Sequence, residues 1–330
     1  MRTILLGIAV WLSALAGHAA TLTDTYSGYF VIGDSLSDNG NLFARTGQPP
    51  APYYEGRFSN GPVFSDFLAN GFVEGVTTRN YAFGGARAID RTPAGPIDDL
   101  GTQVTRFLGD AASGLGHRPL VSVWMGANDI LQAFGAGGDP FGTAVAAANN
   151  VASAVGQITS DPVAGVRDIV VMTLPDFGQI PQFAELPKLD PTLSDADRAQ
   201  LKAAATGATD LFNGTLLGAL DAAVSDDVNL TVVDVGTLFS GIIENPSSIG
   251  QVDVTGACIN PVSGYCGPAA AETTLFFDSV HPNTAAHQEL ARVISEEVTP
   301  VPLPAGLPLL IGGLGALWGV GRLRTARAQA

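Results

Sequence analysis

The sequence predicts an α/β fold, a three-layer α/β/α sandwich around a mainly parallel central sheet. Three observations favour it: short apolar runs end in turn residues, amphipathic helical patterns lie between these runs, and no linker interrupts the middle of the chain. Apolar runs of this kind are typical of parallel strands, because helices cover both faces of a parallel sheet. Regular alternation of strands with helices then indicates one domain of three layers.

The N-terminus is typical of a secretory signal peptide. Arg2 precedes an apolar run over residues 4–16, and small residues with one histidine follow at 17–20. Cleavage after Ala19 would place Gly17 at the third position before the cut, where a small side chain is needed. The alternative is an uncleaved membrane anchor, but the run is short for a bilayer span. We therefore expect residues 1–19 to be a signal peptide and the protein to be exported.

The folded domain is expected to cover residues 20–298. Its predicted strands cover residues 29–32, 120–125, 168–174 and 228–235, and helices are predicted over residues 144–158 and 194–223. The longer helix carries an apolar stripe at helical spacing, formed by Leu201, Ala205, Ala208, Phe212, Leu216 and Leu220. Open sheets of this kind place their functional sites at the carboxyl ends of the strands. The residues that follow each strand are therefore the first candidates for chemistry.

Residues 299–330 form a second hydrophobic end. No charged residue occurs from 298 to 321, an arginine cluster follows at 322–327, and prolines between 300 and 308 would break a helix there. The layout resembles the bacterial PEP-CTERM-like sorting tails, here with the box Val-Pro-Leu-Pro-Ala at 301–305. That resemblance implies a sorting protease as a partner, which removes the tail. The alternative is a permanent membrane anchor through residues 305–321. Both predict a secreted or cell-surface bacterial protein.

The net charge of −15 limits the classes of partner. An acidic surface repels phosphate backbones and anionic lipid headgroups, so we expect no nucleic-acid partner. Apolar residues make up 46% of the chain and charged residues 14%, which excludes a disordered, charge-rich protein.

Cys258 and Cys266 are the two cysteines, and they lie close together in the sequence. In an exported protein such a pair favours a disulfide over a metal site. No histidine lies near them with zinc-ligand spacing. We expect neither a metal nor a cofactor.

A serine directly after the first predicted strand is the candidate nucleophile. Ser35 follows Gly33 and Asp34, and a glycine there permits the tight turn that presents a hydroxyl. Serine is a weak nucleophile without a base in hydrogen-bond reach. His281 precedes a predicted helix, and Asp278, three residues upstream, is close enough to orient its imidazole. The three residues make a nucleophile, base and orienter set. The remaining histidines lie in the signal segment, in a glycine-rich turn and inside a helix (His18, His117 and His287).

Acyl transfer also needs donors for the developing oxyanion. Residues 80–86 contain the paired glycines Gly84 and Gly85, whose backbone N–H groups can approach a substrate closely. Residues 126–129 follow the strand at 120–125 and offer the side-chain amide of Asn128.

These stretches together resemble GDSL-type members of the SGNH hydrolase superfamily of lipases and esterases. Gly-Asp-Ser-Leu at 33–36 matches the first family block, and residues 80–86, 126–129 and 278–281 match the glycine, Gly-x-Asn-Asp and Asp-x-x-His blocks. One tripeptide is weak evidence, but four blocks in the family's order, each at a predicted strand end, are specific. The resemblance implies the SGNH-hydrolase, flavodoxin-like form of the predicted fold.

The resemblance also implies an exported carboxylic-ester hydrolase that acts through an acyl-enzyme. Ser35 would be the nucleophile, His281 the base and Asp278 its partner. The oxyanion donors would be the Ser35 N–H, the Gly85 N–H and the Asn128 side chain, with Gly84 as the alternative to Gly85. The implied partner is an ester substrate, either a lipid or a small acyl ester.

Two other functions stay open. The family also includes carbohydrate O-acetylesterases, which here would act on exported polysaccharide. A surface or matrix protein without activity on the same scaffold is the other alternative, and the intact set of Ser35, Asp278 and His281 argues against it. Residues 134–141 have a phenylalanine at each end and three glycines between them. We interpret this segment as a surface loop, with a mobile flap beside the acyl pocket as the alternative.

Overall fold

The computed structural model describes residues 21–73 and 76–299, in which one compact unit runs from Leu22 to Val298. The predicted signal peptide, residues 1–19, lies outside the described residues, and so does the predicted tail apart from Thr299. Within the described ranges, no helix combines the length and the apolar character that a membrane span needs.

Five parallel strands form the central sheet, in the order β2-β1-β3-β4-β5. They are β1 (Gly28–Gly33), β2 (Thr77–Asn80), β3 (Pro119–Trp124), β4 (Asp168–Met172) and β5 (Asn229–Val233). The registers align the carboxyl ends, with Gly33 opposite Trp124 and Met172 opposite Val233. β1, β3 and β4 are buried along their whole length, as expected for strands between two helical layers.

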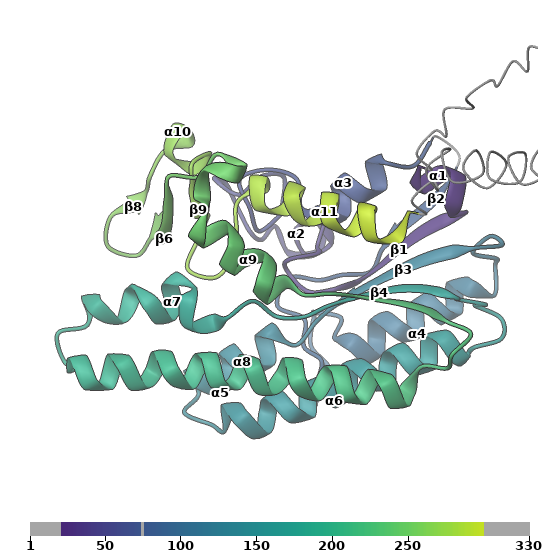
Figure 1. Cartoon of the computed structure of the whole chain (residues 1–330), viewed down its shortest axis with the longest axis horizontal. Helices are drawn as coiled ribbons and strands as arrows, with labels where there is room; N and C mark the ends of the chain where they lie inside the picture. Colours follow the sequence, from purple (N-terminus) through teal and green to yellow (C-terminus); the bar gives the residue numbers. More distant parts are fainter. Residues whose placement is uncertain (1–20, 74–75, 300–330) are drawn as a thin grey trace, which may run out of the picture. The chain divides into compact units, whose positions relative to one another are not determined.

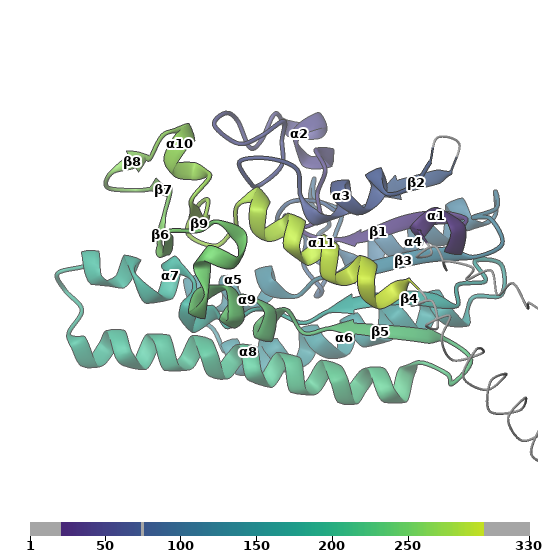
Figure 2. The same ribbon diagram turned by 45° about the horizontal axis from the view of Figure 1, so that its top comes forward.

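Helices cover both faces of the sheet (Figure 1, Figure 2). One face carries α3 (Phe64–Asn70), α9 (Val235–Glu244) and α11 (Thr284–Val298). The other carries α4 (Leu100–Ala111), α5 (Ala127–Gly135), α6 (Pro140–Ser160) and α8 (Asp195–Ala223). The predicted three-layer α/β/α sandwich with a parallel sheet is therefore confirmed.

Shorter elements complete the fold around the central sheet and its helices. The short α-helices are α1 (Leu22–Thr25), α2 (Asn41–Thr46), α7 (Pro181–Ala184) and α10 (Pro268–Ala271). The 3-10 turns are η1 (Phe177–Gln179), η2 (Leu186–Leu189) and η3 (Pro246–Ile249). Two small sheets pair β6 (Asp253–Ala257) with β9 (Thr274–Phe276), and β7 (Ile259–Asn260) with β8 (Gly264–Tyr265).

Several boundaries differ from the predicted ones. The edge strand β2 is absent from the prediction because its sequence, Thr-Thr-Arg-Asn, is polar and largely exposed. The predicted strand 168–174 ends at Met172, because the Leu174 N–H leaves the sheet and bonds to the Asn213 side chain. The predicted helix 144–158 begins earlier, at Pro140, where the Asp139 carboxylate caps the first turn.

The interpretation of residues 134–141 as a surface loop holds for residues 136–139 and is wrong at both ends of the segment. α5 runs to Gly135 and α6 begins at Pro140, so residues 136–139 alone connect the two helices. The Phe134 ring packs against Phe183, with 5.0 Å between ring centroids. This apolar contact holds the end of α5 against the segment around α7.

The expected disulfide between Cys258 and Cys266 is present, with 4.9 Å between the two Cα atoms. It closes the hairpin of β7 and β8. The Cys258 N–H bonds to the Phe276 carbonyl, and the Ile259 N–H bonds to the Phe277 carbonyl. The disulfide segment therefore lies directly against the strand that leads to Asp278.

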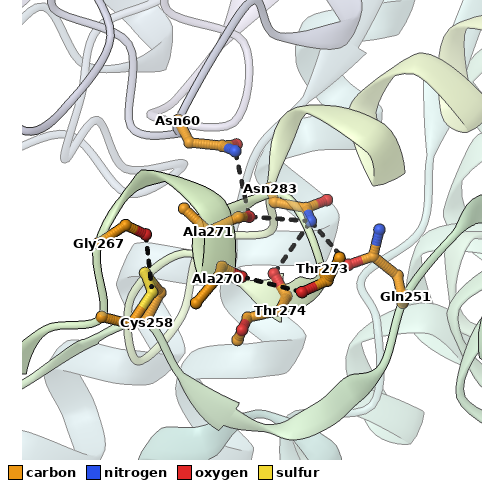
Figure 3. The surroundings of a disulfide bond; sticks show 10 residues. Asn60, Gln251, Cys258, Gly267, Ala270, Ala271, Thr273, Thr274 and Asn283 are labelled. Carbon is orange, nitrogen blue, oxygen red and sulfur yellow. Dashed lines mark hydrogen bonds between the residues drawn. A yellow bond between two sulfur atoms is a disulfide. The ribbon is translucent and has the colours of Figure 1, made fainter.

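Asn283 ties the surroundings of the disulfide to helix α11 (Figure 3). Its Nδ2 donates to Gln251 Oε1 at 2.7 Å and to the Thr274 carbonyl at 3.0 Å. Its Oδ1 accepts the Ala286 N–H at 3.1 Å in the first turn of α11. This buried amide fixes the end of the loop in which His281 lies.

Candidate active site

The first strand ends in a braced turn that presents Ser35. Gln103 on α4 holds the strand end, because its Oε1 accepts the Gly33 N–H and its Nε2 donates to the Gly33 carbonyl, both at 2.9 Å. Asp34 Oδ1 then accepts the Leu36 N–H at 3.0 Å. Ser35 is 6% exposed. A turn held from two sides in this way places the hydroxyl in one position.

Asp278, His281 and Ser35 form a continuous hydrogen-bonded chain. His281 Nδ1 lies 2.7 Å from Asp278 Oδ2, and His281 Nε2 lies 2.7 Å from Ser35 Oγ. The other oxygen of this carboxylate, Asp278 Oδ1, holds the turn from residue 278 to residue 281. It accepts the N–H groups of Val280 at 2.9 Å and His281 at 2.8 Å. Because the carboxylate accepts from Nδ1–H, the Nε2 lone pair faces the serine hydroxyl.

Tyr53, which the sequence did not nominate, binds the same carboxylate. Its hydroxyl donates to Asp278 Oδ2 at 2.7 Å. Edge-on contacts with Phe277 at 5.2 Å and Phe58 at 5.9 Å hold the ring, and the Phe58 ring lies 5.0 Å from that of His281. No local pattern marks Tyr53, because 225 positions of chain separate it from Asp278.

The glycine loop leaves the N–H of Gly85 available. The Gly84 N–H donates to Asp38 Oδ2 at 2.8 Å, so it holds the loop and cannot also serve a substrate. The N–H groups of Gly85 and Ser35 have no acceptor among the described residues. Gly85 adopts a φ of 76°, a conformation that favours glycine. The geometry therefore favours Gly85 over Gly84 as an oxyanion donor.

Asn128 lies in the first turn of α5, which begins directly after β3. Its Nδ2 donates one hydrogen to the Ala86 carbonyl at 2.9 Å, which orients the amide. A primary amide carries a second N–H, and this one remains for a ligand. Asn128, Ser35 and His281 line one cavity.

The pKa values of two carboxyl groups at the site differ from those of free side chains. Burial alone would raise the pKa of Asp278, but the attraction of His281 and the hydrogen bonds from His281, Val280 and Tyr53 outweigh it and lower the pKa to about 2. Asp278 is therefore a carboxylate at neutral pH. Burial raises the pKa of Asp34 to about 7, against the opposing hydrogen bond from the Leu36 N–H. Asp34 can thus be neutral beside Ser35.

The site lies where the order of the strands reverses. β2 and β3 flank β1 on opposite sides, so Ser35 and Asn128 follow neighbouring strands at the crevice where ligands of such sheets bind. His117 is exposed, and His287 is buried in α11. Within residues 21–73 and 76–299, no three His, Cys, Asp or Glu side chains lie together as potential metal ligands.

The order of the motifs around this site agrees with a known family. Residues 29–294 match the model of the GDSL-like lipase/acylhydrolase family. The chain belongs to this family. A GDSL-like lipase/acylhydrolase cleaves ester bonds, and the protein is therefore an ester-bond hydrolase.

Relatives of this GDSL-like hydrolase cover most of the chain. This chain is 28% identical to the phosphatidylcholine-sterol acyltransferase of Aeromonas hydrophila over 333 aligned positions, which cover 85% of this chain and 92% of the relative. It is 26% identical to the thermolabile hemolysin of Vibrio parahaemolyticus over 301 positions, which cover 85% of this chain and 66% of that relative. Among solved structures, an acetylxylan esterase from Geobacillus stearothermophilus is similar, with a TM-score of 0.44, 17% identity, and coverage of 82% of this chain and 93% of the esterase.

Proposed function

We propose that this acylhydrolase is an exported carboxylic-ester hydrolase that forms a covalent acyl-enzyme on Ser35. The observation that carries the proposal is the chain of two 2.7 Å contacts from Asp278 through His281 to the Ser35 hydroxyl. The second contact joins residues 246 positions apart in the sequence. A hydroxyl, an imidazole and a buried carboxylate in this relation are what nucleophilic acyl transfer requires.

The geometry supports a two-step reaction. Ser35 Oγ attacks the ester carbonyl carbon while His281 Nε2 takes the hydroxyl proton, and the carboxylate of Asp278 stabilises the imidazolium. Collapse of the tetrahedral intermediate breaks the bond to the alcohol, which leaves with the proton from His281. Water then attacks the acyl-enzyme by the same route and releases the acid.

The oxyanion of the intermediate is assigned to three donors. They are the N–H of Ser35, the N–H of Gly85 and the second N–H of the Asn128 amide, because these groups have no competing acceptor among the described residues. Fixed donors aimed at a developing negative charge need no reorganisation during the reaction, which is why they lower its barrier.

Serine-directed labelling tests the nucleophile. A fluorophosphonate probe should label the purified protein, and Ser35→Ala should abolish labelling and reduce the rate of nitrophenyl-ester hydrolysis by about 10⁴–10⁶-fold. Ser263→Ala, at an exposed serine in the β7–β8 hairpin, is the matched control and should behave as the wild type. A Ser35→Ala protein that keeps the wild-type rate would refute the proposal.

Export and processing of the tail are part of the same proposal. A disulfide between Cys258 and Cys266 supports an oxidising compartment, because such bonds are rare in the cytosol. We take residues 1–19 as a signal peptide, and we take the tail as the recognition element of a sorting protease. Intact-mass analysis of the native protein should show a chain that begins at Ala20 and lacks the tail. A mass for the whole chain, recovered from the cytosol, would contradict export.

The substrate is proposed to be a lipid or small acyl ester. One relative, at 28% identity, is named as a phosphatidylcholine-sterol acyltransferase. That name supports an acyl ester as the substrate class. Acetate release from acetylated polysaccharide, measured beside hydrolysis of nitrophenyl esters, tests the carbohydrate alternative.

A further inference from the structure

One cavity is lined both by Ser35 and His281 and by apolar side chains of the core. Several separate segments supply its apolar walls. Among the wall residues are Trp124 at the end of β3, Leu131 on α5, Phe177 and Ile180 after β4, and Phe239 on α9. The cavity therefore adjoins both the reacting atoms and side chains of the core.

The walls can hold hydrocarbon but not a sugar or a charged headgroup. Apart from the reacting groups Ser35 and His281, the polar side chains that reach the cavity are those of Asp34 and Asn128, both beside Ser35. A hydroxyl group placed against these apolar walls would lose its water without finding a hydrogen-bond partner, which is unfavourable. The polar alcohol part of an ester must then lie outside the cavity, and the acyl part inside it.

The cavity is small. Its volume is about 40 Å³. One water molecule needs roughly 10–15 Å³, so this is the space for a small group rather than for a long chain. An acyl chain of eight or more carbon atoms would require the walls to move.

The wall formed by Phe177 and Ile180 is packed in place. Phe177 and Ile180 are each 3% exposed. The Phe177 ring lies parallel to Phe183 at 6.5 Å, and Phe183 in turn meets Phe134 edge-on at 5.0 Å. Moving this wall would break contacts that join the segment after β4 to α5, and closely packed interiors resist such changes.

We propose that this cavity is the acyl pocket and that it selects esters of short acids, with about two to four carbon atoms in the acyl group. The inference rests on the proposed function, since the acyl group is placed by attack of Ser35. It assigns Leu131 and Phe239 as residues that set the chain length, because each forms a wall without belonging to the hydrogen-bonded chain of the site.

A chain-length profile tests the pocket. We would measure kcat/KM of the purified protein on nitrophenyl acetate, butyrate, octanoate and palmitate. We expect the highest values for acetate or butyrate and a decrease of at least about tenfold at octanoate. Leu131→Ala should raise the octanoate-to-acetate ratio about fivefold or more, because it removes part of one wall. Phe239→Leu is a second variant that shortens a different wall and should change the ratio in the same direction.

Leu211→Ala is the matched control, since Leu211 lies on α8 with 39% of its surface exposed and does not line the cavity. It should keep the wild-type profile. A wild-type maximum at octanoate or palmitate would overturn the pocket assignment while hydrolysis itself left the proposed function intact. Unchanged profiles in both wall variants would also overturn it. No hydrolysis of any ester, together with no labelling of Ser35, would reject the proposed function and the pocket with it.

Discussion

The buried His287 imidazole should make one contribution to the stability of the fold that is lost in mild acid. His287 lies in α11 with 1% of its surface exposed, and neither ring nitrogen has a hydrogen-bond partner among the described residues. Burial, together with the neighbouring charge of His281, lowers the pKa of His287 from 6.5 to about 3. The folded protein therefore keeps this imidazole neutral over a range in which the unfolded chain protonates it.

The size of the effect follows from the two pKa values. The unfolded chain gains a proton below pH 6.5 and the folded protein only below about pH 3, so stability is full above pH 6.5 and falls as the pH drops toward 3. At about 1.4 kcal/mol per pH unit, the loss has a ceiling of about 5 kcal/mol and reaches about 2 kcal/mol at pH 5. Such a loss is a large part of the total stability of a typical domain, which is about 5–15 kcal/mol.

Urea unfolding at pH 7 and pH 5, followed by the fluorescence of the buried Trp124, measures the effect. Other groups also contribute to the pH dependence. The pKa of Asp34 is raised to about 7, so its protonation stabilises the fold on acidification. The pKa of Asp278 is lowered to about 2, so acidification removes stability at this residue. Comparison with the His287→Leu variant isolates the effect of the histidine. Between pH 7 and pH 5, the free energy of unfolding of this variant should fall by about 2 kcal/mol less than that of the wild type. His117→Leu, at an exposed site, should keep the wild-type dependence. Parallel curves for wild type and His287→Leu would refute the reasoning.

Three further predictions concern the site and its frame. Asn128→Ala should lower kcat by about 10²–10³-fold with little change in the unfolding midpoint, since it removes one oxyanion donor; an unchanged kcat would contradict that role. Tyr53→Phe should lower kcat about tenfold, because Asp278 loses one of its hydrogen bonds. A lower unfolding midpoint with an unchanged kcat would reduce Tyr53 to a packing residue. Gly126→Ala should destabilise the fold by at least about 2 kcal/mol in a urea titration, because Gly126 has a φ of 117° and an added Cβ would overlap the Phe212 ring; unaltered stability would show that α5 can shift without cost.

The sequence by itself determined the layers of the fold and nominated the candidate reacting groups. Buried strands and amphipathic helices leave periodic apolar patterns, and the register of the sheet then brings the strand ends together. The pairing of Asp278 with His281 is also local, because the carboxylate closes its own turn on the N–H groups of Val280 and His281. Such features depend on neighbours within a few residues, so a linear pattern can reveal them.

The tertiary structure alone decided the contacts between distant segments. Tyr53 meets Asp278 across 225 positions, and Asp38 selects Gly85 by binding the N–H of Gly84 across 46 positions. The proposed acyl pocket likewise has walls from several segments that no sequence pattern connects. Side-chain contacts of this kind depend on how the chain packs in three dimensions, and a hydrogen bond or a void leaves no periodic trace in the residues that form it.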